Sequence, residues 1–357
     1  MKFLRVLLVL LIFVAATLTR VNLFDESGRD INTYKRAVEE FLEGKNPYEW
    51  TVKTYDSAKD PWNHGFATLP GLLFVNAPLY LIHLSSDISL DILWKIPVLL
   101  ADLGIGLFLF KTLNKKNYYM AVFGLAVWLF NPYMQVIGKY SHTDPIAIFF
   151  LLLGLYFLEE DDVLAGVFYA LAVAFKTFPL ILLPLFLIKS DNKIRFITAA
   201  DIIGFALSVP FMSSIYDFTT YVKGALLVHG SRIMQGRPFL FYISYYYKIE
   251  LFQIIPTSVY AKLALFSGWI ASILVLFKNK NFDKYVLSLI CFILFYAFTP
   301  VLNRTYLLWF MPVLIVALSK LVSTKKFYLY FLSLTGFYSF YFWYISQWKD
   351  GFHIWHP

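Results

Sequence analysis

The sequence predicts an all-α fold, a polytopic membrane helix bundle of about eleven helices. Hydrophobic residues make up 59% of the 357 residues and charged residues only 15%, whereas a soluble domain has about 45–50% and about 25%. The mean hydropathy is +0.63. The apolar residues also gather into long runs, so the bilayer must be the main solvent. Because the helices of such a protein form one bundle, we expect a single transmembrane domain over residues 1–357.

Each predicted helix is an apolar run that ends near Lys, Arg, Asp, Asn or Pro. The runs are 4–19, 92–111, 118–136, 145–158, 163–175, 178–188, 196–212, 259–277, 283–299, 304–320 and 327–346. The first could instead be a cleaved signal peptide, because Lys2 and Arg5 precede it and Ala15-Ala16 lie near its end. Residues 163–188 form either two short helices or one helix kinked at Pro179.

Basic residues in short loops predict the orientation, because Lys and Arg are retained in the cytoplasm. They fall in alternate loops, in the clusters Lys2 and Arg5; Lys111, Lys115 and Lys116; Lys189, Lys193 and Arg195; Lys278, Lys280 and Lys284; and Lys320, Lys325 and Lys326. The amino terminus is therefore predicted to be cytoplasmic. For all five clusters to lie on the cytoplasmic side, residues 66–84 must lie in or dip into the outer face without spanning. Residues 163–188 must also form two helices.

Two loops, residues 20–90 and 213–258, are too long to be simple connectors and are predicted to form the outer, functional face. The first contains a predicted amphipathic helix at 31–43. Its apolar stripe consists of Ile31, Tyr34, Val38, Phe41 and Leu42. We interpret it as a helix in the membrane interface. Gly44 suits the end of this helix, and Pro47 prevents it from continuing.

Ionisable residues at the outer helix ends are the candidate functional groups, because such groups near lipid need a partner or a task. They are Asp30, Lys95, Asp102, Lys139, His142, Asp144, Lys176, His229, Arg232 and Arg304. Simpler interpretations remain open. Asp30 and Asp144 could cap helices, Lys176 could snorkel to the headgroups, and Lys95 and Asp102 could form ion pairs with neighbouring helices. The loop with His229 and Arg232 could anchor an aromatic belt, and Arg304 could contact headgroups.

Carboxylates in the first loop and cations in several others suit sugar transfer from a polyprenyl phosphate. A carboxylate can act as general base on the acceptor hydroxyl. Lys and Arg can stabilise the charge on the departing phosphate. We expect Lys176, Arg232 and Arg304 to converge on that phosphate. Nucleic acid is not implied by the net charge of +8, and the single Cys291 excludes an internal disulfide.

Six short motifs follow one another along the chain. They are Asp30-Ile-Asn-Thr-Tyr34 with Gly44-Lys-Asn-Pro47-Tyr48; Lys95 with Asp102; Asn131-Pro132 with Asp144; Ala172-Val-Ala-Phe-Lys176-Thr-Phe-Pro179; His229-Gly-Ser-Arg232 with Phe241-Tyr242; and Arg304-Thr-Tyr306-Leu-Leu-Trp309-Phe. In this order they resemble the GT-C superfamily of integral-membrane glycosyltransferases. The similarity is to the polyprenol-phosphate-mannose-dependent mannosyltransferases and to the first mannosyltransferase of the GPI-anchor pathway.

The resemblance implies an inverting transfer of a hexose, with mannose the commonest, from a polyprenyl-phosphate sugar to a glycan or glycolipid acceptor at the outer or luminal membrane face. Asp30 matches the family's base. We assign the donor phosphate to Lys176, Arg232, Arg304 and His229, and substrate binding to Tyr34, Lys95, Asp102, Lys139, His142, Asp144 and Tyr306. The expected partners are these two substrates and membrane lipids.

A divalent cation is only weakly supported, and no cofactor is otherwise implied. Where the GPI enzyme has D-x-D, this chain has Gly28-Arg29-Asp30, and one carboxylate beside an Arg is a poor cation site. Two other functions compete. Inverted repeats would favour a transporter or flippase of lipid-linked sugars, and the sequence shows none. A non-catalytic subunit of a glycosyltransferase complex is suggested only by Gly28.

Overall fold

The computed structural model describes residues 2–24, 30–55, 65–131, 142–228, 235–236, 257–299, 301–302 and 304–346. These residues confirm the all-α class. The helices are α1 (Lys2–Val21), α2 (Asp30–Leu42), α3 (Tyr48–Tyr55), α4 (Gly71–Leu84), α5 (Leu90–Asn114), α6 (Tyr118–Leu129), α8 (Asp144–Phe157), α9 (Asp162–Phe175), α10 (Leu183–Lys189), α11 (Lys193–Ser208), α12 (Ile215–Ala225), α15 (Thr257–Lys278), α16 (Lys284–Phe298), α17 (Met311–Leu321) and α18 (Thr324–Ser346). Short 3-10 helices are η1 (Phe178–Leu182), η2 (Val209–Phe211) and η4 (Arg304–Leu308), and the short strands β1 (Gln235–Gly236) and β2 (Val301–Leu302) pair with each other.

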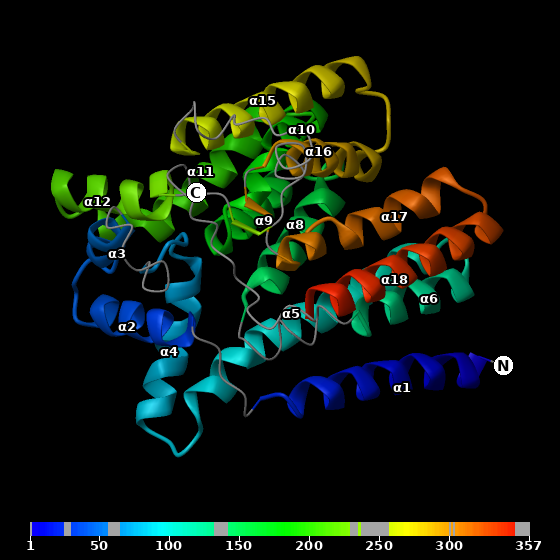
Figure 1. Ribbon diagram of the computed structural model, residues 1–357, viewed down its shortest axis with the longest axis horizontal. Coiled ribbons are helices and arrows are strands. Elements are labelled where there is room, and N and C mark those ends of the chain that lie inside the picture. Colours follow the sequence, from blue (N-terminus) through cyan, green and yellow to red (C-terminus); the bar gives the residue numbers. More distant parts are fainter. Residues whose placement is uncertain are drawn as a thin grey trace.

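Helical segments occupy every predicted run, as far as the described residues extend. Helices α3 and α12 were not predicted. Figure 1 shows the long helices α1, α5 and α18 extending in similar directions, with α2, α3 and α12 gathered at the end of the molecule away from the amino terminus.

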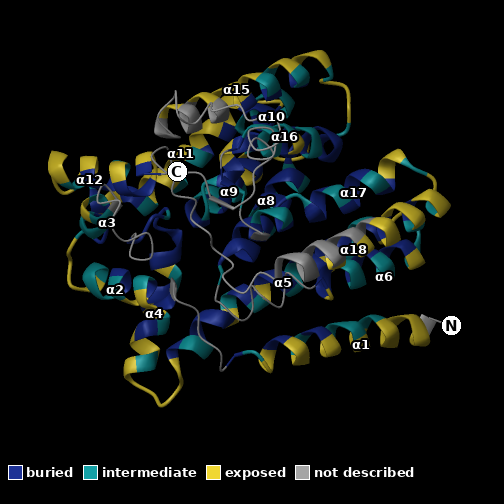
Figure 2. Cartoon of the chain, in the orientation of Figure 1, coloured by how far each residue is buried: buried dark blue, intermediate teal, exposed yellow. Residues whose placement is uncertain are grey.

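Apolar side chains on the outside of the bundle show that this is a membrane protein. The segments Phe3–Val21, Leu90–Asn114 and Lys193–Phe211 are long and apolar enough to cross a bilayer. On α1 and α11 large apolar groups face outward; Phe3 is 76% exposed and Phe205 is 62% exposed. Figure 2 shows exposed residues along α1 and α11 and buried ones on the inner helices. Such apolar surface needs lipid to cover it.

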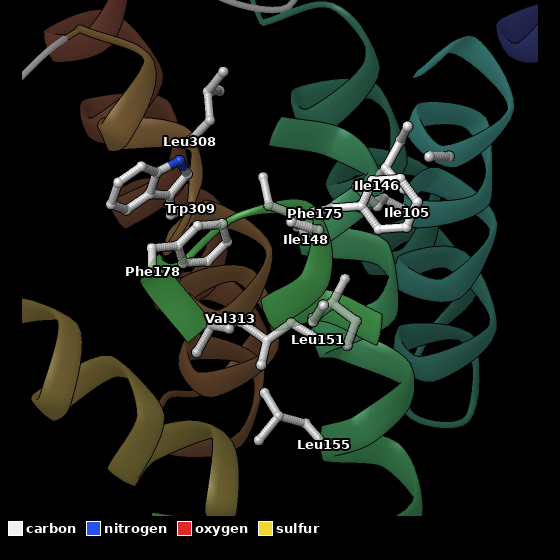
Figure 3. Packing of buried hydrophobic residues seen from close by; sticks show 14 of the residues in the cluster. Ile105, Ile146, Ile148, Leu151, Leu155, Phe175, Phe178, Leu308, Trp309 and Val313 are labelled. Atoms are coloured by element: carbon white, nitrogen blue, oxygen red, sulfur yellow. The ribbon is translucent and has the colours of Figure 1, made fainter. Parts of the chain in front are cut away.

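The core of the bundle lies between α5, α8, α9, α16 and α17. Figure 3 shows α8 contributing Ile148, Leu151 and Leu155 to this packing, opposite Val313 of α17. Helices α9 and α11 approach so closely that a Cβ at Gly166 would lie 2.3 Å from the carbonyl oxygen of Phe196. Only glycine fits there.

The segment 163–188 folds as two helices, and the single kinked helix is wrong. Helix α9 ends at Phe175, and Lys176 is extended, with φ −153° and ψ 146°. Helix α10 returns beside α9: the rings of Tyr169 and Phe186 are 4.7 Å apart. Ser190, which follows α10, donates a 2.5 Å hydrogen bond to Asp162, at the start of α9. Pro179 favours this break, because it lacks an N–H and restricts the residue before it.

The five predicted cytoplasmic clusters lie at one end of the bundle, which we call the basic end. Direct contacts connect them: Tyr118 to the carbonyl oxygen of Arg5 (2.7 Å), Lys116 to that of Ser319, Lys320 to Asp283, Lys284 to Glu159 (3.6 Å) and Lys189 to Glu159 (3.0 Å). The loops that carry these clusters therefore meet at one end of the bundle, as their predicted common side requires.

The amphipathic helix of the first long loop is confirmed as α2, but its placement in lipid is wrong. Ile31 and Val38 are only 8% and 1% exposed, because the apolar stripe packs against α4. The ring of Phe41 lies 5.5 Å from that of Phe74 on α4. Gly44 ends the helix with φ +73°, a left-handed conformation that suits glycine. Helix α4, with 14 residues, is about 21 Å long, too short to span a bilayer about 30 Å thick.

Candidate active site

A buried carboxylate joins three distant segments at the end of the bundle opposite the basic end. Asp144 begins α8, whose other end is bound at the basic end by Lys284, which donates to the carbonyl oxygen of Tyr156 (3.0 Å). The Asp144 side chain is 0% exposed, and its Oδ2 lies 3.2 Å from Nζ of Lys176. Its Oδ1 accepts a 2.7 Å hydrogen bond from the indole N–H of Trp309. A charge in such a place is stable only when it is paired.

The contacts of Asp144 exclude its simpler interpretation as a helix cap. Thr143 occupies the N-cap position of α8 and makes no side-chain capping bond, while Pro145 stands in the first turn. Pro suits this position because no intrahelical N–H is needed there. The Asp144 carboxylate is directed to Lys176 and Trp309 instead.

Lys176 points into the protein, so the snorkelling interpretation is wrong. It stands at the turn between α9 and η1, and its side chain is 22% exposed. An ammonium group has three N–H donors. Asp144 therefore anchors Lys176 while leaving part of its side chain accessible.

Trp309 belongs to one of the six motifs, but sequence reasoning did not place it in the site. Its ring is stacked on Phe178, with centroids 4.3 Å apart and planes at 10°, as Figure 3 shows. The ring of Tyr306 stacks on it as well, at 3.8 Å and 26°. The indole N–H of Trp309 could have indicated a role in the site, because a buried indole N–H usually finds a hydrogen-bond acceptor.

The strand pair brings the second long loop to the same region. Gln235 pairs with Val301 and Gly236 with Leu302, in parallel register. Strand β2 directly precedes η4, which begins at Arg304 and contains Tyr306. Lys139, His229, Arg232 and the side chain of Arg304 lie outside the described residues. His142, two residues before Asp144, is half-buried.

Helix α2 is connected to this site through the start of α4. Asp30 is the first residue of α2, and its side chain lies outside the described residues. Tyr34 is 9% exposed, with its ring centroid 6.3 Å from that of Phe66. Five residues further along the chain, a Cβ at Gly71 would lie 2.8 Å from the carbonyl oxygen of Ala174. Ala174 is two residues before Lys176.

Lys95 and Asp102 form a second buried cluster around the end of α1. Asp102 forms an ion pair with Arg20, and both side chains are nearly inaccessible. Arg20 also donates to the carbonyl oxygen of Leu129 (2.7 Å). Lys95 donates to that of Phe24 (2.8 Å). The ion pair with a neighbouring helix is thus confirmed for Asp102, but Arg20, its partner, was missed, because nothing in the sequence relates α1 to α5.

Among the described residues, no group of three or more His, Cys, Asp and Glu side chains could hold a metal ion. Gly28 and Arg29, which weakened the cation hypothesis, lie outside those residues. The one cysteine, Cys291, is buried in α16.

Comparison with known proteins supports a class of enzyme. No protein-family model matches the chain. The chain is similar to proteins named GPI mannosyltransferase 1. It is 26% identical to that of Kluyveromyces lactis over 235 residues, which cover 61% of this chain and 58% of the relative. It is 23% identical to that of Candida albicans over 278 residues, covering 71% and 68%. The chain thus matches less than two thirds of the Kluyveromyces protein, and these relatives confirm the resemblance predicted from the six motifs.

Proposed function

We propose that this protein is a GT-C mannosyltransferase that transfers mannose from a polyprenyl-phosphate donor to a glycolipid or glycan acceptor, with inversion, at the outer or luminal membrane face. The observation that carries the proposal is the meeting of three motif segments at the Asp144 carboxylate, through Lys176 and Trp309. The names of the two relatives supply the mannosyl group and the GPI glycolipid as acceptor.

The cations of the site bind the donor phosphate. Lys176 is held at one position by Asp144, and its side chain keeps 22% of its surface accessible. The pairing of β1 with β2 brings Gln235 and Gly236, which follow Arg232 in the sequence, to the segment that precedes Arg304. His229 belongs to the same loop. As the bond between the sugar and the phosphate breaks, these groups stabilise the charge on the leaving phosphate.

Asp30 is the general base. Its carboxylate takes the proton of the acceptor hydroxyl, whose oxygen attacks the anomeric carbon as polyprenyl phosphate leaves. A single displacement of this kind inverts the configuration. Tyr34 lies one helical turn further on the same face of α2 and orients the acceptor. Lys139, His142 and Tyr306 bind the substrates near the Asp144 pair, while Lys95 and Asp102 contribute by fixing the end of α1.

The proposed orientation predicts which introduced cysteines react with an impermeant thiol reagent. Ser86 and Ser213 are exposed and lie away from the basic end, whereas the exposed Asn281 lies in one of its clusters. In intact cells Ser86→Cys and Ser213→Cys are expected to be labelled, and Asn281→Cys only after lysis. The buried Cys291 gives a low background. The opposite pattern of labelling would refute the proposed orientation.

The donor class is tested by incubating purified protein with a panel of polyprenyl-phosphate sugars and a glycolipid acceptor. Mass spectrometry should detect a hexose added to the acceptor with polyprenyl-phosphate mannose and not with the other sugars. Lys176→Met should abolish the product, because it removes a charge next to the departing phosphate. Transfer from a sugar nucleotide alone, with none from any polyprenyl-phosphate sugar, would rule out the proposed donor.

A further inference from the structure

Trp309 connects two of the three segments that carry the proposed phosphate-binding cations. On one face its ring stacks on Phe178, two residues after Lys176. Tyr306, two residues after Arg304, stacks on it as well. Its indole N–H is bonded to Asp144, which holds Lys176. One buried side chain, 5% exposed, therefore contacts both segments and the anchor between them.

The surroundings of Trp309 exclude the usual role of an aromatic residue in a sugar-binding site. Phe178 and Tyr306 stack on the ring, so no open face is left for a sugar. The edge carrying the N–H is directed to Asp144. These contacts suit a residue that positions its neighbours.

We propose that Trp309 is a positioning residue for the donor phosphate. Its N–H fixes the Asp144 carboxylate so that Oδ2 faces Lys176, and its stacked ring sets the spacing between the Lys176 segment and the Arg304 segment. This inference rests on the proposed function, since it takes the phosphate of a polyprenyl-phosphate sugar as the ligand.

The physical reason is the buried position of Asp144. Without the indole donor, one oxygen of a fully buried carboxylate would lack its hydrogen bond. The carboxylate would then turn toward other donors, and Lys176 would lose its fixed partner. Donor binding and stabilisation of the leaving phosphate should suffer, while binding of the acceptor should change little.

The experiment compares Trp309→Phe, which keeps an aromatic ring and removes the N–H, with Trp269→Phe. Trp269 is a matched control, because its indole N–H also bonds to η1, at the carbonyl oxygen of Leu180 (3.3 Å). For Trp309→Phe, KM for polyprenyl-phosphate mannose should rise about tenfold, the scale of one hydrogen bond to a charged group. The kcat should fall as well, because Lys176 also stabilises the charge on the leaving phosphate. The acceptor KM should stay within about twofold. Trp269→Phe should match the wild type in all three.

Two further variants keep the test decisive. Phe178→Leu removes one stacking face but keeps the N–H, and it should also raise the donor KM if spacing matters. Asp144→Asn combined with Trp309→Phe should be no worse than the worse single variant, because both act on one contact. Additive effects in the double variant would show that Trp309 has only a structural role. So would a rise in both KM values and a fall in kcat together with a lower Tm.

Lys176→Met separates failure of this inference from failure of the proposed function. If it abolishes transfer, as expected, while Trp309→Phe and Phe178→Leu behave as wild type, only the inference is wrong. If Lys176→Met itself leaves donor use unchanged, the phosphate assignment is wrong and the inference falls with it.

Discussion

Replacing Asp30 with Asn is expected to cut mannosyl transfer by about 10²-fold or more, the usual scale for losing a general base. Asp30 begins α2, so the competing role is that of a helix cap. Asn caps a helix about as well as Asp but cannot accept the acceptor's proton. Yield and thermal stability should therefore remain nearly unchanged.

The measurement is the rate of product formation with saturating donor, together with Tm. Asp25→Asn is the matched control, because it removes a carboxylate from the same loop. Near-wild-type transfer by Asp30→Asn, with transfer abolished by Asp25→Asn or Asp144→Asn, would show that the base is misassigned. A lower Tm for Asp30→Asn together with the lower rate would favour the capping role.

Replacing Arg20 with Met is expected to lower the free energy of unfolding by about 3–5 kcal/mol, the range for breaking a buried ion pair. The change leaves the Asp102 carboxylate, 2% exposed, without its partner. It also removes the hydrogen bond to the carbonyl oxygen of Leu129. The end of α1 should loosen, and with it the start of the loop that carries Asp30.

Equilibrium unfolding in mild detergent measures this effect. The double variant Arg20→Met with Asp102→Leu should recover much of the loss, because apolar replacement of a whole buried pair is often neutral. Lys53→Met is the control: it breaks an exposed pair with Glu49, and such pairs contribute little. If Arg20→Met unfolds as the wild type does, the buried pair is not what holds α1 in place.

The sequence by itself determined the fold class, the positions of the predicted helices and the ends of α2. These properties depend on residues close together in the chain. The length of an apolar run sets the extent of a helix, and Gly44 ends α2 because a left-handed residue is needed after its last turn. The basic residues of each loop can also be recognised from the local sequence, and their alternation indicated that the five clusters share one side.

The candidate site was predicted only in part. Ionisable side chains near lipid are unusual enough to be noticed, which is why Asp144 and Lys176 were singled out. Trp309 was not, because an aromatic residue in an apolar helix is ordinary, and neither was Arg20, which follows the apolar run of α1.

The partners of these groups were decided by the tertiary structure alone. Trp309 is 165 residues from Asp144, and Arg20 is 82 residues from Asp102. Periodicity tells which face of a helix is apolar, but it does not tell whether lipid or protein covers that face. For α2 the covering surface is α4, and for the segment 163–188 the return of α10 along α9 depends on side chains that meet only after the chain has turned. In both cases the local sequence is compatible with either arrangement, and contacts between residues far apart in the chain decide which one forms.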